Sequence, residues 1–235
     1  MEEELTKPLV SVIIPAHNEN GYIEKTLLSV LNSSYKNYEI IVVCDSCSDN
    51  TEEISKRYTD KVYSVNFKNA GGSRNFGVSK ARGEVFAFLD ADTICSENYL
   101  FSIVNVINSG FDYGCSKIIS ETGTHKGKFM IWRFNHYNRT DKTFGGNCFV
   151  RKEWFSKVNG FDIDMMKGED TDLGNRLFKS GAKYFYIEDA YIITSERRFI
   201  KYGYLNYFIN SMKDAFWYSL NNKKYKEIYK RKTTD

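Results

Sequence analysis

Short apolar runs alternate with helical patterns along the first half of the chain. The runs are rich in Val and Ile, as in buried strands, and between them apolar residues recur every three or four positions. The pattern predicts strands at 9–14, 39–43, 62–65 and 84–89 and helices at 23–31, 51–58 and 72–81. Strands that alternate with helices form parallel sheets covered on both faces. We therefore expect an α/β fold with a Rossmann-like, mostly parallel sheet flanked by helices.

The second half of the chain has a less regular pattern. It predicts helices at 98–108 and 171–179, strands at 113–119, 148–150, 182–187 and 191–194, and a loop at 160–168. From Phe199 onward, apolar residues recur at helical spacing, through Leu205, Met212 and Leu220. We therefore expect one large domain over residues 1–198 and an aromatic and basic C-terminal helical extension over residues 199–235.

Composition narrows the partners and the compartment. A formal net charge of +3 over 235 residues is too small to indicate nucleic acid as a partner. The five cysteines form no dense framework, as expected of reduced thiols in the cytoplasm. Residues 1–4 lack a signal-peptide pattern, and no apolar run approaches the roughly 20 residues that span a bilayer. We expect a cytoplasmic protein with at most peripheral membrane contact; its oligomeric state stays open.

Four polar or glycine-rich segments follow or lie between the predicted strands. They are residues 15–19, 44–46, 69–74 and 90–92. Ligands of parallel sheets bind at the carboxyl ends of the strands, because the connecting loops meet at that edge. We therefore expect all four segments to line one binding site.

Asp90 and Asp92 flank a single alanine directly after the apolar run 84–89. Neighbouring buried carboxylates repel each other, and a hard divalent cation removes that cost. Mg²⁺ or Mn²⁺ accepts one or two carboxylates and completes its shell with water and substrate phosphate oxygens. The alternative is a loop that caps the next helix. The position after a buried strand favours the metal site.

An acidic pair, Glu169 and Asp170, stands just before the helix predicted at 171–179. A carboxylate at the mouth of a cleft can accept a proton from a sugar or lipid hydroxyl. The pair can equally serve to cap the helix and to interact with its macrodipole. The residues alone leave both interpretations open.

Two further side chains suggest nucleotide binding. Arg74 follows two glycines and can pair with phosphate or a base edge, or it can be a surface residue at a helix start. Asp45 ends a predicted strand and can accept a hydrogen bond from a nucleobase or a ribose, or it can belong to a turn.

Arg197 and Arg198 follow the last predicted strand. Two adjacent guanidinium groups can hold a pyrophosphate or an anionic acceptor. A salt bridge with Glu188 or Glu196 is the equally plausible alternative.

Together these segments resemble glycosyltransferase family 2, the inverting enzymes with a GT-A fold. The resemblance covers about residues 8–195 and rests on motifs at 12–19, 40–51, 74–92, 145–151 with 160–162, and 169–173. His17 stands where the family usually has Tyr, and Cys44 stands where it often has the first of two aspartates. The Gln-x-x-Arg-Trp segment of processive members is replaced by residues 195–199, which implies transfer of single sugars.

The resemblance implies a role for each matched position. The nucleotide would contact Pro15, Ala16, Glu19, Asp45, Gly71, Arg74, Asp90 and Ala91. Asp92, with Asp90, would bind Mg²⁺ or Mn²⁺, and Asp170, beside Glu169, would be the catalytic base. Gly146, Asn147, Arg197 and Arg198 would face the acceptor or the diphosphate. The donor would be a UDP- or GDP-type nucleotide-diphosphate sugar, and the acceptor a carbohydrate or a polyprenyl-linked lipid.

Two other functions compete with this one. A sugar-phosphate nucleotidylyltransferase shares the sheet type, but such enzymes usually carry Gly-x-Gly-x-x and then Arg near the first strand, where this chain has Pro-Ala-His-Asn-Glu at 15–19. A non-catalytic sugar-nucleotide-binding domain would not need the acidic residues that this chain retains.

The aromatic helix after Phe199 and the basic residues 223–232 suggest a peripheral contact with the inner face of the membrane. The alternative is that the aromatic residues cover the sheet or form a dimer contact.

Overall fold

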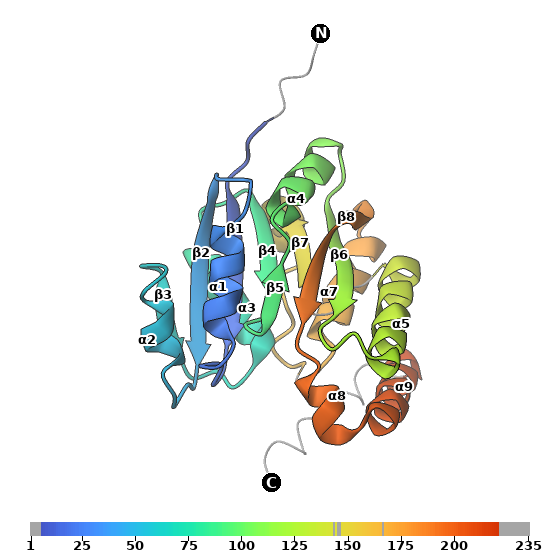
Figure 1. Cartoon of the computed structure of the whole chain (residues 1–235). Coiled ribbons are helices and arrows are strands. Elements are labelled where there is room, and N and C mark those ends of the chain that lie inside the picture. Colours follow the sequence, from blue (N-terminus) through green and yellow to red (C-terminus); the bar gives the residue numbers. More distant parts are fainter. Residues whose placement is uncertain (1–5, 143, 145–146, 166, 221–235) are drawn as a thin grey trace.

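The computed structural model describes residues 6–142, 144, 147–165 and 167–220. Within them, eight strands form a single sheet in the order β3-β2-β1-β4-β7-β6-β8-β5 (Figure 1). The strands are β1 (Val10–Ala16), β2 (Tyr38–Asp45), β3 (Val62–Val65), β4 (Val85–Leu89), β5 (Thr93–Cys95), β6 (Tyr113–Ser120), β7 (Asn147–Arg151) and β8 (Tyr184–Thr194). The ends of these strands determine where the loops between strands and helices lie.

The strand directions divide the sheet into two parts. β3, β2, β1 and β4 are all parallel to their neighbours, as the alternation of strands and helices predicts. β7 is antiparallel to both β4 and β6, while β8 is parallel to β6 and antiparallel to β5. The predicted α/β fold with a mostly parallel sheet is confirmed, with β7 and β5 as the antiparallel members.

Helices cover both faces of the sheet (Figure 1). They are α1 (Ile23–Leu31), α2 (Thr51–Ser55), α3 (Ala70–Lys80), α4 (Tyr99–Asn108), α5 (His125–Asp141), α6 (Lys152–Lys157), α7 (Glu169–Lys179), α8 (Arg197–Tyr202) and α9 (Tyr204–Leu220). Successive residues of β1 point to opposite faces: Val12 and Ile14 lie in the cluster with α1 and α4, and Ile13 lies in the cluster with α6 and α7. Burial on both faces explains why the central strands read as continuous apolar runs.

Helix α3 approaches β1 very closely at Gly77. A Cβ atom at that position would lie 2.5 Å from Cγ2 of Ile13, so only glycine fits there. The close packing fixes the position of α3, which carries Arg74, against β1. The glycine thus contributes to the site through the position of its helix.

The sequence pattern misses some elements and divides others wrongly. It does not predict α5, β5 or α6, and it splits β8 into two strands at a place where the pairing with β6 is irregular. The single helix predicted after Phe199 is two helices separated by Gly203, whose φ is +78°. α5 escapes prediction because its large residues Phe129 and Trp132 are exposed, so its apolar pattern does not follow the core.

The C-terminal helices pack on the rest of the molecule through Phe199. This ring is buried, stacks on Phe134 of α5 at 5.9 Å and meets Tyr207 of α9 at 4.7 Å. The division of the chain at residue 198 stays a prediction. The basic residues 223–232 lie outside the described residues. Among those described, no helix has the length and apolar character needed to cross a bilayer.

Candidate active site

The carboxyl ends of β1, β2 and β4 bring the four predicted loop segments to one edge of the sheet. Ala16 is paired with Cys44 in the parallel register, so the residues after both strands leave the sheet side by side. Nδ1 of His17 lies 2.7 Å from the carbonyl oxygen of Asp45. The prediction that these segments converge is confirmed.

Arg74 joins two of the predicted carboxylates. Its Nη2 lies 2.8 Å from Oδ1 of Asp90 and its Nη1 lies 2.7 Å from Oε1 of Glu169. The guanidinium also lies 5.3 Å from the centre of the Phe161 ring, and the side chain is 10% exposed. Burial alone would lower the pKa of Arg74, but the two carboxylates outweigh it and raise the pKa. This ion pair network holds α3, the end of β4 and α7 together.

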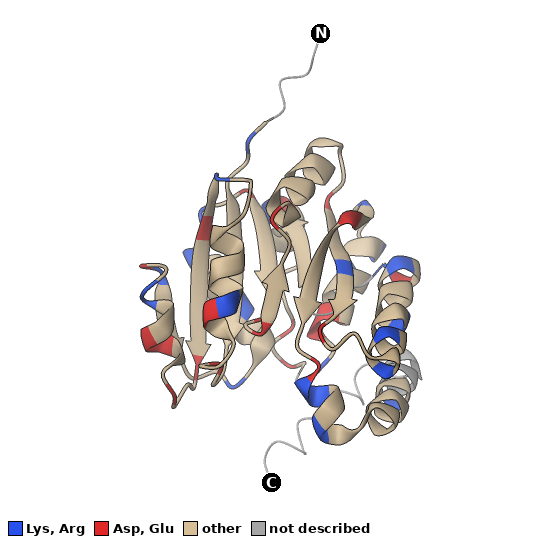
Figure 2. Cartoon of the chain, viewed as in Figure 1, with Lys and Arg blue, Asp and Glu red and all other residues tan. Residues whose placement is uncertain are grey.

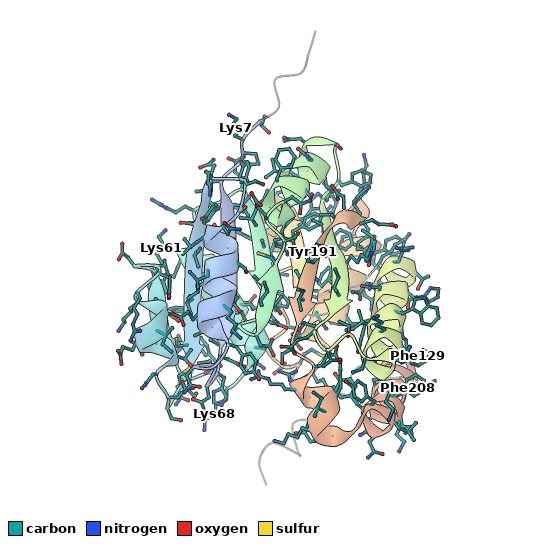
Figure 3. All side chains as sticks on the ribbon, viewed as in Figure 1. Lys7, Lys61, Lys68, Phe129, Tyr191 and Phe208 are labelled. Atoms are coloured by element: carbon teal, nitrogen blue, oxygen red, sulfur yellow. The ribbon has the colours of Figure 1, made fainter. Side chains whose placement is uncertain are left out.

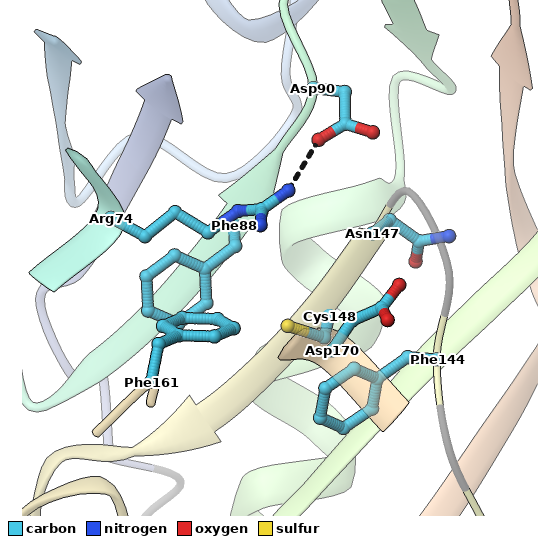
Figure 4. Close-up of a pocket in the computed structure, with 8 residues that line it drawn as sticks. All are labelled: Arg74, Phe88, Asp90, Phe144, Asn147, Cys148, Phe161 and Asp170. Carbon is cyan, nitrogen blue, oxygen red and sulfur yellow. Dashed lines mark hydrogen bonds and ion pairs between the residues drawn. The ribbon is translucent and has the colours of Figure 1, made fainter. Parts of the chain in front are cut away.

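Asp170 lies in a hollow next to this network, and Figure 4 shows the side chains that surround it. The lining residues are Arg74, Phe88, Asp90, Phe144, Asn147, Cys148, Phe161 and Asp170. Burial and the neighbouring charge of Glu169 raise the pKa of Asp170, against the opposing effect of Arg74. The backbone N–H of Thr171 donates to Oδ1 of Asp170 at 2.7 Å. A carboxylate with a raised pKa at the wall of a hollow is suited to accept a proton.

A second cation, Arg197, joins Glu19 and Asp92. Its Nη2 lies 3.1 Å from Oδ2 of Asp92 and also donates to Oε1 of Glu19. The guanidinium lies 4.7 Å from the centre of the Tyr22 ring. Burial and the charge of Asp90 raise the pKa of Asp92 to about 6, although Arg197 acts in the opposite direction. Asp92 thus carries a charge that Arg197 only partly compensates.

Asp92 also borders a second hollow, on the side of α1 and the ends of β5 and β8. The lining residues are Tyr22, Lys25, Thr26, Asp92, Ile94, Glu121, Ile193 and Ser195. The backbone N–H of Ser195 donates to the carbonyl oxygen of Asp92 at 3.2 Å, which ties the residues before α8 to the Asp90–Asp92 loop.

The sequence left open a salt bridge of Arg197 or Arg198 with Glu188 or Glu196, and the structure does not contain it among the described residues. Glu188 pairs with Arg139 at 2.9 Å, and Glu196 is buried and accepts hydrogen bonds from Ser120, Thr122 and Tyr204, so neither pairs with these arginines. Arg198 is exposed. The local alternative is wrong because the partners of Arg197 come from loops more than 100 positions earlier in the chain.

Asp45 is buried, and its carboxylate is already surrounded by donors. Oδ1 accepts the backbone N–H groups of Phe67 at 2.8 Å and Lys68 at 2.9 Å, and Oδ2 accepts those of Asn69 at 3.0 Å and the Ser73 hydroxyl at 2.8 Å. Burial would raise the pKa of Asp45, but these hydrogen bonds lower it. In this arrangement Asp45 holds the turn before α3, and a nucleobase would have to displace one of these donors.

The remaining predicted residues lie around the same edge. Pro15 and Ala16 end β1; Gly71 and Ala91 are buried; Asn147 is buried at the start of β7; Gly146 lies outside the described residues. Oδ1 of Asn147 accepts the backbone N–H of Ser116 at 2.8 Å, which fixes the amide next to Asp170 (Figure 4). The carbonyl oxygen of Ala91 accepts the hydroxyl of Thr26 at 2.8 Å, which anchors the Asp90–Asp92 loop to α1.

Residues 11–163 match the model of the family described as glycosyl transferase family 2. The chain belongs to this family. It is 36% identical over 205 residues to an uncharacterized glycosyltransferase of Rickettsia prowazekii, covering 79% of this chain and 63% of that protein. It is 28% identical over 200 residues to an uncharacterized glycosyltransferase of Rickettsia bellii, covering 76% of this chain but only 28% of that protein.

A relative from Escherichia coli has a described reaction. This chain is 32% identical over 169 residues to the UDP-Glc:alpha-D-GlcNAc-diphosphoundecaprenol beta-1,3-glucosyltransferase WfgD, covering 69% of this chain and 66% of that protein. These relatives show that the chain belongs to the family; they do not assign a role to any single residue.

Solved structures share the fold at low sequence identity. TarS 1–349 of S. aureus in complex with UDP has a TM-score of 0.67 and 22% identity, covering 82% of this chain and 62% of that one. The mannosyltransferase PcManGT of Pyrobaculum calidifontis, in complex with GDP-Man and Mn²⁺, has a TM-score of 0.67 and 17% identity, covering 80% and 57%. These likenesses confirm the expected GT-A type of fold.

The chemistry of the carboxylates fits the hard cation that the family resemblance implies. One oxygen of Asp90 pairs with Arg74, and its other oxygen accepts no hydrogen bond from the described residues. Oε2 of Glu19, beside Asp92, is buried and likewise has no partner among them. No group of three or more His, Cys, Asp or Glu side chains with metal-binding arrangement occurs in the described part of the chain. A site with few protein ligands is what Mg²⁺ or Mn²⁺ uses when substrate phosphates complete its shell.

Sequence reasoning missed the link between Glu19 and Arg197 and the aromatic walls of the Asp170 hollow. Phe88 belongs to the apolar run 84–89, and nothing local distinguishes it from an ordinary core residue. Phe161 did have a signal in the sequence, because it stands in the motif at 160–162 that resembles the family. The Arg197 contact had no such signal.

Proposed function

We propose that this chain is an inverting glycosyltransferase that moves a single sugar from a nucleotide-diphosphate sugar to a hydroxyl acceptor. Family membership supports the reaction class. The observation that carries the proposal is the arrangement around Asp170. Its carboxylate has a raised pKa and faces the same hollow as Arg74 and Asp90. These two residues are predicted to contact the nucleotide and, for Asp90, to help bind the metal ion.

In the proposed reaction Asp170 acts as the general base. The acceptor oxygen forms a bond to the anomeric carbon while its proton passes to the Asp170 carboxylate. The bond from that carbon to the diphosphate oxygen breaks, and the nucleoside diphosphate leaves with the electron pair. Attack on the face opposite the leaving group inverts the anomeric configuration. A well-placed base contributes about 10²–10⁴-fold to such a rate.

Glu169 has a positioning role in this proposal. Its carboxylate is held by Arg74, so it is less available to accept a proton than Asp170. Its charge also helps keep the pKa of Asp170 raised. Asn147 lies across the hollow, where its amide can contact an acceptor hydroxyl (Figure 4).

Asp92, with Asp90, would hold Mg²⁺ or Mn²⁺, which supplies positive charge for the departing diphosphate. Arg197, now paired with Asp92 and Glu19, has a guanidinium suited to bind a phosphate oxygen. Pro15, Ala16, Gly71 and Ala91 would form the backbone surface for the nucleoside. Arg198 would contribute charge at the entrance.

The similar proteins suggest the substrates. WfgD by its name uses UDP-Glc and an acceptor on diphosphoundecaprenol, and PcManGT was solved with GDP-Man and Mn²⁺. We propose a UDP- or GDP-linked hexose as the donor and a polyprenyl-diphosphate-linked sugar as the acceptor, with the protein acting in the cytoplasm at the inner face of the membrane.

The test is acceptor-dependent release of nucleoside diphosphate. The chain is incubated with Mn²⁺, UDP-glucose or GDP-mannose, and GlcNAc-diphosphopolyprenol, and the product linkage is read by NMR. We expect a product of inverted configuration whose formation stops when the acceptor or Mn²⁺ is left out. Retained configuration would contradict the single displacement.

Two controls separate the other functions. Sugar 1-phosphate with UTP should yield no pyrophosphate; its release would make the chain a nucleotidylyltransferase. Asp92→Ala should bind UDP with much reduced dependence on Mn²⁺, and undiminished dependence would remove Asp92 from the metal site. Donor binding with no transfer to any acceptor would favour a non-catalytic binding domain.

A further inference from the structure

Helices α5 and α9 lie side by side at one corner of the molecule, and α8 adjoins them (Figures 1 and 3). The guanidinium of Arg133 on α5 donates to Oγ of Ser211 on α9 at 3.1 Å and lies 4.5 Å from the centre of the Phe208 ring. Phe199 of α8 packs between the two helices, against Phe134 and Tyr207. These contacts fix the three helices relative to one another.

Large apolar side chains are exposed on all three helices. We define the α5–α9 patch as its exposed large apolar side chains, namely Phe129, Trp132, Ile200, Leu205, Ile209 and Met212. Trp132 is 61% exposed and Leu205 is 70% exposed. Phe129 and Trp132 are three positions apart and their rings stack at 6.0 Å. Positions 205, 209 and 212 recur at helical spacing, so they lie along one side of α9, as Phe129 and Trp132 lie along one side of α5.

Lysines accompany the apolar side chains. Lys126, Lys128, Lys201 and Lys213 are exposed on the same three helices, and none forms a salt bridge with another described residue. Figure 2 shows positive residues along α5 and α8. Asp141, at the far end of α5, is the single acidic residue in that helix. The patch therefore combines apolar bulk with positive charge.

We propose that the α5–α9 patch docks the protein on an anionic phospholipid bilayer. Exposed Trp and Phe beside Lys are suited to the boundary between headgroups and acyl chains, where rings bury area and ammonium groups meet lipid phosphates. A second copy of the chain is a poorer fit, because a two-fold contact through this patch would bring lysines against lysines.

The α5–α9 patch lies close to the candidate active site, because α8 connects the two. α8 begins at Arg197, which touches Asp92, and continues to Ile200 within the patch. A helix of this length spans about 9 Å, so the bilayer surface would lie close to the metal-side carboxylates. This part rests on the proposed function: a diphosphate-linked lipid acceptor could enter the site without leaving the membrane.

Vesicle co-sedimentation of the full chain tests the docking without any substrate. We expect binding to vesicles of equal parts phosphatidylglycerol and phosphatidylcholine, and much weaker binding to phosphatidylcholine alone. Phe129→Ser with Trp132→Ser should lower the partition coefficient on the order of tenfold. Lys126→Glu with Lys128→Glu should lower it on the anionic vesicles by about fivefold or more for each residue.

Matched variants elsewhere on the surface control for general effects. Phe101→Ser on α4 and Leu28→Ser on α1 remove apolar residues of similar exposure, and Lys152→Glu with Lys179→Glu changes the charge equally on α6 and α7. These should leave vesicle binding within about twofold. The thermal midpoint of every variant, with and without UDP and Mn²⁺, reports whether its fold and nucleotide site are intact.

Equal binding to both kinds of vesicle, or equal losses in the patch and control variants, would overturn the proposal. So would a dimer in light scattering that only the patch variants convert to monomer, because the patch would then be a self-interface. Vesicle binding with no sugar transfer would leave the docking surface standing and remove the proposed function; transfer to a water-soluble acceptor without vesicle binding would do the reverse.

Discussion

Two arginines each bridge two carboxylates at the carboxyl edge of the sheet, and their surroundings differ. The side chain of Arg74 is 10% exposed and lies against Phe161, inside the packed body of the domain. The side chain of Arg197 is 32% exposed and lies against Tyr22, at the start of a short helix. An arginine between two carboxylates therefore occurs once in the interior and once near the solvent.

The difference indicates which ion pairs are permanent. Removing the partner of a buried charge is costly, so Arg74 must stay with Asp90 and Glu169 through the reaction cycle. Arg197 keeps access to water, so another cation can replace it on Asp92 at a smaller cost. We interpret Arg74 as part of the frame and Arg197 as an exchangeable group.

Asp170→Asn is expected to have the largest effect on activity. It removes the proposed base beside the Arg74 network and should lower kcat by about 10²–10⁴-fold with little change in the affinity for UDP and Mn²⁺. Initial rates and nucleotide titrations measure the two effects separately. A variant that retains the wild-type kcat would exclude Asp170 as the base.

The same substitution should lower the activity but raise the stability of the folded protein. The pKa of Asp170 is raised in the folded state, so the folded protein binds more protons than the unfolded chain and loses stability as pH rises above the unfolded pKa. Asn carries no charge, so Asp170→Asn should raise the thermal midpoint at neutral pH. A lowered midpoint would mean that the loss of activity reflects damage to the fold.

Arg74→Ala is expected to have the largest effect on stability. It leaves Glu169 and Asp90 without their shared cation, and breaking a buried pair in this way costs about 3–5 kcal/mol, with a value near the lower end expected because Asp90 is 35% exposed. Urea unfolding measures the change. Arg82→Ala is the matched control, because Arg82 is 73% exposed in its pair with Glu39 and should cost under about 1 kcal/mol.

The Arg74 side of the site could be predicted in outline from the sequence. Apolar runs predict β1, β2 and β4, the rule that ligands bind at the carboxyl edge of parallel strands places their loops together, and the structure confirms this. The prediction did not extend to the contacts. The sequence leaves Asp45 open between a nucleotide ligand and a turn residue, and in the structure its oxygens accept the backbone N–H groups of residues 67–69. Backbone donors leave no trace in the side-chain pattern.

On the Arg197 side, the sequence indicated the charged residues but not which of them contact one another. Arg197 meets Glu19 and Asp92 because β5 pairs with β8, and this antiparallel pairing joins segments about 100 residues apart. β5 is three residues long, too short for an apolar pattern to reveal it. Short-range reasoning therefore offered Glu188 and Glu196 as the alternative partners, and neither pairs with Arg197.

The next largest effect is expected in the pH dependence of stability, through Asp92 on the Arg197 side of the site. Burial raises the pKa of Asp92 to about 6, so between the unfolded pKa near 4 and this value the folded state binds more protons, and stability falls as pH rises. Asp92→Asn should remove about 2 kcal/mol of this decline. Denaturation midpoints for both proteins at about pH 4.5 and about pH 7 give the double difference. Equal pH dependence in the two proteins would show that Arg197 already neutralises Asp92 fully.

Arg197→Gln gives the smallest but most specific expected effect, because two affinities should move in opposite directions. If Arg197 occupies carboxylates that a metal ion can use, its removal should strengthen the binding of Mn²⁺ alone, by about threefold for a partly exposed pair. Removal of a guanidinium that reaches the diphosphate should weaken the binding of UDP with Mn²⁺ by about tenfold. Titrations followed by the electron paramagnetic resonance of free Mn²⁺ measure both. Arg198→Gln, a change of the adjacent and exposed guanidinium, should not strengthen the binding of Mn²⁺ alone. If Arg197→Gln weakens both affinities, Arg197 belongs to the permanent frame as Arg74 does, and the contrast between the two arginines disappears.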